Sequence, residues 1–101
     1  MLVFVTHENC LYCTKMVRST YADPRLATTI NRSFVPLTLD GGGDLPLLKE
    51  LGVRSYPTTF VISPRAIVLA RFDGYVTADA MAVRLAATQN AVAMVREAAA
   101  Q

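Results

Sequence analysis

The first residues of the chain form a short run in which nearly every side chain is apolar. This run, MLVFVT, is too short for a helix and places apolar side chains on both faces of an extended segment. Such a pattern is typical of a central strand that is covered on both sides. The sequence therefore predicts a strand over residues 2–6 with helices packed against both faces of its sheet.

Helical and strand-like segments alternate along the rest of the chain. We expect further strands over residues 34–40, 58–62 and 66–72, and helices over residues 10–20, 24–30, 45–51 and from Thr77 onward. Side chains that can act as helix N-caps precede three of these helices, namely Asn9, Asp23 and Asp44. Gly52 is expected to end the third helix.

The connections between these segments predict how the strands pair. The first two strands are joined through helices and should be parallel, whereas a short turn at residues 63–65 joins the last two as an antiparallel hairpin. The sequence therefore predicts an α/β fold with a mixed central sheet of about four strands and helices on both faces. The GGGD segment at residues 41–44 is interpreted as a flexible loop within a single domain that spans residues 1–101.

Composition and charge exclude several classes of function. A chain of 101 residues with 52% hydrophobic side chains can bury a core without a disulfide. Its ten basic and eight acidic side chains are scattered and leave a net charge of +2, which predicts neither a nucleic acid nor an anionic membrane as partner. The apolar stretches are far shorter than the roughly 20 residues of a membrane span.

The beginning of the chain bears on its compartment. No secretory signal precedes the first strand, so the chain as it stands is expected to be cytoplasmic. We also expect it to be a monomer. If it is an excised domain, a periplasmic or exported location is the alternative.

Both cysteines lie three residues apart in NCLYC, residues 9–13. Cys10 opens a predicted helix, where free N–H groups and the helix dipole favour a thiolate and should lower its pKa below about 8.5. Cys13 lies one turn further along the same face, close enough to attack a sulfur bound to Cys10. A bridge between them closes too short a loop to add much stability, so the spacing favours thiol:disulfide exchange over a structural role.

Two other uses of the cysteines remain open from the spacing. They could be buried small hydrophobic residues, or they could join His7 in an H-x2-C-x2-C site for a metal such as a cuprous ion. A closed zinc site would need a fourth ligand from another cysteine or histidine, which the chain lacks. Thr14 stands where haem attachment requires histidine.

A proline begins the third predicted strand, in VRSYPTTFVI at residues 53–62. On local grounds Pro57 is an ordinary first residue of a strand, where a missing N–H costs no ladder hydrogen bond. If its peptide bond is cis, it instead turns the backbone sharply beside a neighbouring segment.

Taken together, these motifs resemble the thioredoxin superfamily over nearly the whole chain. The strand that leads into CLYC, the Asp23-Pro24 cap, FVPLTLD, LLKELGV and the Tyr-Pro-Thr before a hairpin are most similar to the thioredoxin-like domains of thiol:disulfide interchange proteins. The resemblance implies that Cys10 is the nucleophile and Cys13 the resolving thiol. It also implies that Pro57 is a cis-proline facing them and that the backbone of Tyr56 pairs with an extended substrate strand.

The chain departs from the family pattern in ways that affect the chemistry. Asn9 replaces the tryptophan that precedes the first cysteine, and Leu11-Tyr12 replaces Gly-Pro between the cysteines. Phe4 stands where many members bury an acid that relays the resolving proton. Proton transfer must then use water or another group, for which His7 and Glu8 are the nearest titratable candidates.

The sequence thus predicts a thiol:disulfide oxidoreductase that exchanges its Cys10–Cys13 pair with protein thiols and disulfides and needs no cofactor and no metal. The alternative is a non-catalytic thioredoxin-like module that binds a peptide or a copper ion.

Overall fold

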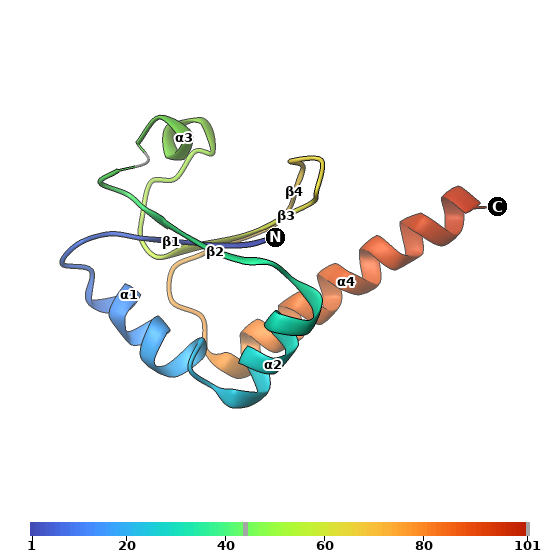
Figure 1. Cartoon of the computed structure of the whole chain (residues 1–101), viewed down its shortest axis with the longest axis horizontal. Coiled ribbons are helices and arrows are strands. Elements are labelled where there is room, and N and C mark those ends of the chain that lie inside the picture. The colour runs from blue at the N-terminus through green and yellow to red at the C-terminus, as the bar shows by residue number, and fades with distance from the viewer. Residues whose placement is uncertain (44, 101) are drawn as a thin grey trace.

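The computed structural model describes residues 1–43 and 45–100, in which helices and strands follow the predicted order. A four-stranded mixed sheet has helices on both faces, which confirms the predicted α/β architecture (Figure 1). The elements are, in chain order, β1 (Leu2–Thr6), α1 (Leu11–Lys15), the π-helix η1 (Met16–Thr20), α2 (Pro24–Ser33), β2 (Pro36–Asp40), α3 (Leu45–Glu50), β3 (Thr58–Ile62), β4 (Val68–Asp73) and α4 (Ala78–Ala100).

The strands lie in the order β2-β1-β3-β4. The β1 and β2 strands are parallel, whereas β3 is antiparallel to both β1 and β4, as the connections predict. Phe4 lies at the centre of this arrangement, opposite Thr38 on one side and Thr59 on the other. The strand that leads to the cysteines is therefore paired along both of its edges.

The core lies on both faces of β1, because successive side chains of a strand point to opposite sides. Leu2 and Phe4 face the side that carries α1, α2 and α4, whereas Val3 and Val5 pack with Leu48 of α3 on the other side (Figure 1). These four side chains of β1 are at most 6% exposed. This rigid strand fixes the position at which the chain turns toward the cysteines.

The α2 helix begins as predicted, because the Asp23 carboxylate accepts hydrogen bonds from the N–H groups of Arg25 and Leu26. It continues to Ser33, three residues beyond the predicted end, since the N–H of Phe34 still donates to the carbonyl of Ile30. The strand predicted over residues 34–40 accordingly begins only at Pro36.

The turn between β3 and β4 is longer than predicted. The Ser63 hydroxyl accepts from the N–H groups of Arg65 and Ile67, and Ala66 adopts a left-handed conformation with φ of 64°. These contacts keep residues 66 and 67 in the turn, so β4 begins at Val68 rather than at residue 66.

Local backbone features mark the end of α3 and the start of α4. Gly52, with φ of 70°, follows the end of α3 as predicted, whereas the predicted cap Asp44 lies outside the described residues. Thr77 caps α4 through a hydrogen bond from the N–H of Ala80. The C-terminal part of α4 extends away from the sheet (Figure 1). Within residues 1–43 and 45–100, no helix combines the length and the apolar character needed to cross a membrane.

Candidate active site

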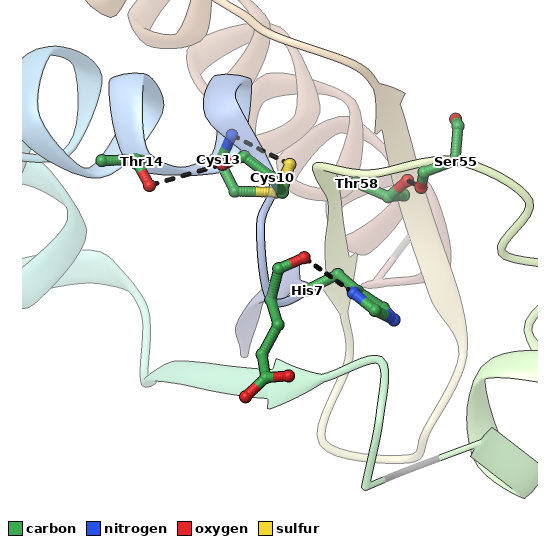
Figure 2. Close-up of a disulfide and its surroundings, with 7 residues drawn as sticks. His7, Cys10, Cys13, Thr14, Ser55 and Thr58 are labelled. Atoms are coloured by element: carbon green, nitrogen blue, oxygen red, sulfur yellow. Dashed lines mark hydrogen bonds between the residues drawn. A yellow bond between two sulfur atoms is a disulfide. The ribbon is translucent and has the colours of Figure 1, made fainter.

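Cys10 and Cys13 form a disulfide at the N-terminus of α1, with their Cα atoms 5.2 Å apart (Figure 2). The backbone of Cys10 is extended, and its Sγ accepts a hydrogen bond of 3.1 Å from the N–H of Cys13. The sulfur of Cys10 thus lies where a capping oxygen is usually found, against the free N–H groups of the first turn.

The prediction that Asn9 caps this helix is wrong. Asn9 has φ of 56° and forms part of the turn after β1, a left-handed conformation that asparagine tolerates better than most residues. The chain becomes helical only at Leu11, so the N-cap position falls on Cys10 itself.

The two cysteines differ in exposure. Cys13 is 2% exposed and packs in the buried cluster that contains Phe4 and Met16, whereas Cys10 is partly exposed at the edge of the same cluster. Phe4, in the same cluster, is itself only 6% exposed. The buried side of the disulfide is therefore apolar at this position.

Pro57, directly before β3, is fully buried, and the Tyr56–Pro57 peptide bond is cis. The Thr58 hydroxyl donates to the carbonyl of Ser55, which closes a tight turn around the proline. Figure 2 shows the disulfide on the side of α1 that faces the segment from Ser55 to Thr58. The structure thus brings the cysteine pair and the Tyr-Pro-Thr motif to one place.

A third segment completes this site, the turn of Gly74, Tyr75 and Val76 between β4 and α4, which we call the 74–76 turn. The N–H of Gly74 donates to the carbonyl of Pro57 at 2.8 Å. The buried hydroxyl of Thr20 donates to the carbonyl of Val76. The 74–76 turn therefore connects the proline segment to the helix that carries the cysteines.

The helix after the cysteines is not the regular α-helix predicted for residues 10–20. Residues Met16–Thr20 form a π-helix, closed by a hydrogen bond from the N–H of Tyr21 to the carbonyl of Met16. A π-turn is wider than an α-turn and is often found at functional sites. Here the adjacent hydroxyls of Ser19 and Thr20 both reach the 74–76 turn.

Tyr75 lies against the cysteine helix. Its hydroxyl is hydrogen-bonded to that of Ser19 at 3.1 Å, its ring lies 4.7 Å from Nζ of Lys15, and its centroid is 6.3 Å from that of Tyr12. The hydrogen bond with Ser19, together with one from Thr20 and the charge of Lys15, holds the pKa of Tyr75 below its usual value. Sequence reasoning missed this residue, because nothing local links position 75 to the helix.

His7 lies beside Tyr56, with 5.0 Å between their ring centroids, and its Nδ1 is 3.0 Å from the carbonyl oxygen of Glu8. In residues 1–43 and 45–100, no three His, Cys, Asp or Glu side chains are close enough together to hold a metal ion. The arrangement His7, Cys10 and Cys13 considered from the sequence is therefore not assembled as a metal site.

Gly41, the residue after β2, lies directly beneath this pair of rings. A Cβ at this position would lie 2.7 Å from the Tyr56 hydroxyl and 2.8 Å from Cδ2 of His7. A side chain at the first glycine of the GGGD segment would therefore displace the Tyr56 or His7 ring, a contact that its interpretation as a flexible loop did not include.

A second hydrogen-bonded pair lies on the Phe4 side of the sheet. The hydroxyls of Tyr21 and Thr59 are 2.7 Å apart, and the Tyr21 ring packs edge-on against Phe4 with centroids 5.0 Å apart. Burial raises the pKa of Tyr21 to about 12, despite the opposing effect of the Thr59 hydrogen bond. Tyr21 therefore stays protonated over the ordinary pH range and is not a proton acceptor for Cys13.

The loop that leads to Tyr56 is held by an arginine from β4. The guanidinium of Arg71 donates to the carbonyls of Leu51 and Gly52, which follow α3, and packs over Phe60 at 5.3 Å from its ring centroid. Its Nε also pairs with Asp73 at 2.9 Å. These contacts position the segment between α3 and Pro57.

Comparison with known proteins agrees with this geometry. Residues 1–89 match the family model of the thioredoxin-like domain, so the chain belongs to that family. No curated protein matches it significantly.

Several solved structures have the same fold. A thioredoxin from Thermus thermophilus is 21% identical, with a TM-score of 0.73 over 90% of this chain and 72% of that chain. The C-terminal domain of DsbD from Neisseria meningitidis is 22% identical, with a TM-score of 0.67 over 78% of this chain and 71% of that domain. A candidate disulphide-isomerase from Bacteroides thetaiotaomicron is 30% identical, with a TM-score of 0.62 over 69% of this chain and 60% of that chain.

These findings confirm the resemblance predicted from the sequence. A thioredoxin-like fold that places a close pair of cysteines at a helix N-terminus supports thiol:disulfide oxidoreductase chemistry in general.

Proposed function

We propose that this chain is a thiol:disulfide oxidoreductase in which Cys10 reacts with protein partners and Cys13 resolves the resulting mixed disulfide. The observation that carries the proposal is the unequal exposure of the two cysteines. Cys10, at the N-terminus of α1, is partly exposed, whereas Cys13 is only 2% exposed. A partner can reach only the first without opening the core.

The surroundings of Cys10 favour its role as nucleophile. In the disulfide its Sγ already accepts the N–H of Cys13 at 3.1 Å. The same hydrogen bond, with the free N–H groups of the first turn, stabilises a thiolate after reduction. Cys13, surrounded by apolar side chains, is better suited to remain protonated until the partner has bound.

The proposed exchange conserves atoms and electrons. In the reducing direction, the Cys10 thiolate attacks one sulfur of a partner disulfide; a bond between Cys10 and the partner forms, the partner's disulfide breaks, and the leaving sulfur takes up a proton. Cys13 then loses its proton and attacks Sγ of Cys10. The Cys10–Cys13 disulfide forms as the bond between Cys10 and the partner breaks, and the released partner sulfur takes up a proton. The partner leaves as a dithiol that has gained two electrons.

The proton of Cys13 must leave by a route other than a buried acid, because Phe4 occupies that position. Water and the loop side chains of His7 and Glu8 are the acceptors that we propose. His7 and Glu8 follow β1 and precede Cys10 in the turn that leads into α1.

We also propose that Tyr56 and Pro57 line the groove for the partner's backbone. Pro57 directly precedes β3 and lies in the chain between Ser55 and Thr58, the two residues that Figure 2 shows beside the disulfide. The backbone of Tyr56 then serves as the edge along which an extended partner segment pairs.

A non-catalytic module that binds a peptide or a copper ion is the competing function. Three measurements on the purified protein distinguish the two: metal content, the number of free thiols before and after reductant, and the rate at which a disulfide-bonded protein is reduced. Exchange predicts two thiols that oxidise reversibly without bound metal and a reduction rate well above that of free cysteine. Bound copper, or thiols that do not cycle, would favour the module.

A further inference from the structure

The Tyr56 side chain lies between two segments that each follow one of the parallel strands. His7, after β1, has its ring centroid 5.0 Å from that of Tyr56. Gly41, after β2, is buried against the same ring, and a Cβ there would lie 2.7 Å from the Tyr56 hydroxyl and 2.8 Å from Cε1 of its ring. We call the space between His7 and Gly41 that holds this ring the 7–41 niche.

The niche holds the ring where it contacts both halves of the core. Tyr56 packs against the cluster that contains Phe4 on one side of the sheet and against the cluster that contains Leu48 on the other. The N–H of Gly41 donates a hydrogen bond of 2.7 Å to the carbonyl of Thr6 at the end of β1. The backbone at residue 41 is thereby tied to the central strand, so it has little freedom to retreat from an added side chain.

The backbone of Tyr56 is the part of its segment that is left for a partner. The carbonyl of Ser55 accepts from the Thr58 hydroxyl, and the carbonyl of Pro57 accepts from the N–H of Gly74. Among the residues that the structure describes, none forms a hydrogen bond with the N–H or the carbonyl of Tyr56. An extended partner can pair with these two groups, whereas a tyrosine ring that swings over them would obstruct the pairing.

We propose that Gly41 is a positioning residue for partner recognition, because it provides the space in which the Tyr56 ring stays clear of the backbone that pairs with the partner. This inference rests on the proposed function, since it concerns the partner that reacts with Cys10. A side chain at residue 41 expels the ring from the 7–41 niche. The displaced ring, or a shift of the turn that carries it, then obstructs an extended peptide without changing the chemistry at Cys10.

The test compares two probes on a Cys13→Ser protein, in which a mixed disulfide on Cys10 is not resolved. One probe is a short unstructured peptide whose single cysteine is joined to 2-nitro-5-thiobenzoate, and the other is cysteamine joined to the same chromophore. The Cys10 thiolate attacks the sulfur of the peptide or of cysteamine; a new disulfide to Cys10 forms, the disulfide of the probe breaks, and the coloured thiolate leaves.

Each second-order rate is divided by the rate of free cysteine with the same probe, which removes differences in probe reactivity. The ratio of the peptide value to the cysteamine value then measures what the peptide backbone contributes beyond the reactivity of Cys10. The proposed groove predicts a ratio above one in the Cys13→Ser protein.

Added Gly41→Ala should lower this ratio about fivefold, the scale of one lost hydrogen bond, and should leave the cysteamine rate unchanged. Gly43→Ala is the matched control, because a Cβ there meets no atom within 4 Å, and it should leave the ratio unchanged. In a Tyr56→Ala protein no ring remains to be displaced, so adding Gly41→Ala should change nothing further. His7→Ala removes the other wall of the niche without adding bulk and should lower the ratio by a smaller factor, because the ring is held less firmly.

An unchanged ratio in Gly41→Ala, an equal loss in Gly43→Ala, or a loss that persists without the Tyr56 ring would overturn the inference while leaving the exchange function intact. Should Gly41→Ala not fold, His7→Ala decides the question, and an unchanged ratio in that protein would overturn the inference. A ratio of one in the Cys13→Ser protein itself would overturn it together with the groove. Failure of the exchange function looks different: the Cys13→Ser protein would then react with the cysteamine probe no faster than free cysteine.

Discussion

The N–H of Gly74 donates a 2.8 Å hydrogen bond to the carbonyl of Pro57, which joins the turn after β4 to the proline that directly precedes β3. The buried hydroxyl of Thr20 donates a hydrogen bond to the carbonyl of Val76 in the same turn. Three segments far apart in the sequence are thereby held together around the disulfide. The contact between Thr20 and Val76 can be tested by removing its hydroxyl donor.

Thr20→Val should destabilise the fold by about 1–3 kcal/mol, because it leaves the carbonyl of Val76 without its donor in a buried position. The measurement is the free energy of unfolding in urea. Thr28→Val is the matched control, since its hydroxyl donates to a backbone carbonyl on an exposed face of α2 and its loss should cost less than about 0.5 kcal/mol. Equal losses for the two variants would contradict a special role for the Thr20 contact.

Tyr21 should make the fold lose stability at alkaline pH. Its pKa of about 12 in the folded chain lies above the value of 10 for an unperturbed tyrosine, so its contribution is complete below pH 10 and is lost as the pH rises toward 12. At about 1.4 kcal/mol per unit, the loss approaches 2 kcal/mol by about pH 11.5.

The check is to measure the free energy of unfolding at pH 9 and pH 11.5 in the parent chain and in Tyr21→Phe. The other titrating groups are common to both proteins, so their difference isolates Tyr21. The decline should be smaller in Tyr21→Phe by about 2 kcal/mol. Parallel declines in the two proteins would exclude this role.

Arg71 should contribute more to stability than its single ion pair indicates. Arg71→Ala removes two hydrogen bonds to the carbonyls after α3 and is expected to cost about 1–3 kcal/mol. Arg71→Lys should recover only part of this, because an ammonium cannot reproduce the planar fork of a guanidinium. The measurement is the free energy of unfolding in urea for both variants, with Arg65→Ala in the exposed turn as control. A loss of stability in Arg71→Ala no larger than that of the control would show that the Asp73 pair and the two carbonyl contacts are dispensable.

Cys10 should be more acidic than an ordinary thiol once the disulfide is reduced. Its sulfur lies at the helix N-terminus, where the N–H of Cys13 and neighbouring free N–H groups favour the thiolate. The rate of iodoacetamide alkylation of Cys10 in a Cys13→Ala protein should therefore inflect below the value of about 8.5 for a free cysteine. An inflection at or above that value would remove the argument for Cys10 as the attacking thiol.

The sequence predicted the features that depend on local patterns. The apolar run at residues 2–6 indicated a strand buried on both faces, and Val3 and Phe4 are indeed buried on opposite sides. The spacing of the cysteines placed both within the first helical turn, where they form a disulfide. Such features depend on side-chain periodicity, which a single sequence displays directly.

The features that sequence reasoning missed depend on contacts between distant segments. Thr20 and Val76 are 56 residues apart, as are Ser19 and Tyr75, and no local pattern indicates either pair. These contacts accompany the π-helical turn that replaces the expected α-helix. The cap was misplaced for a more local reason: asparagine is a good N-cap, but it also tolerates the left-handed conformation that the turn requires at Asn9.

The most direct test of the account is whether the two cysteines trap partners unequally. Cys13→Ala and Cys10→Ala proteins are each mixed with an oxidised protein substrate, quenched with acid and alkylating reagent, and analysed on a gel without reductant. Because only Cys13 can release a partner bound to Cys10, the Cys13→Ala protein should accumulate a mixed disulfide that disappears on addition of reductant, whereas Cys10→Ala should accumulate little. Equal trapping by both variants, or none by either, would contradict the assignment of Cys10 as the attacking thiol and Cys13 as the resolving one.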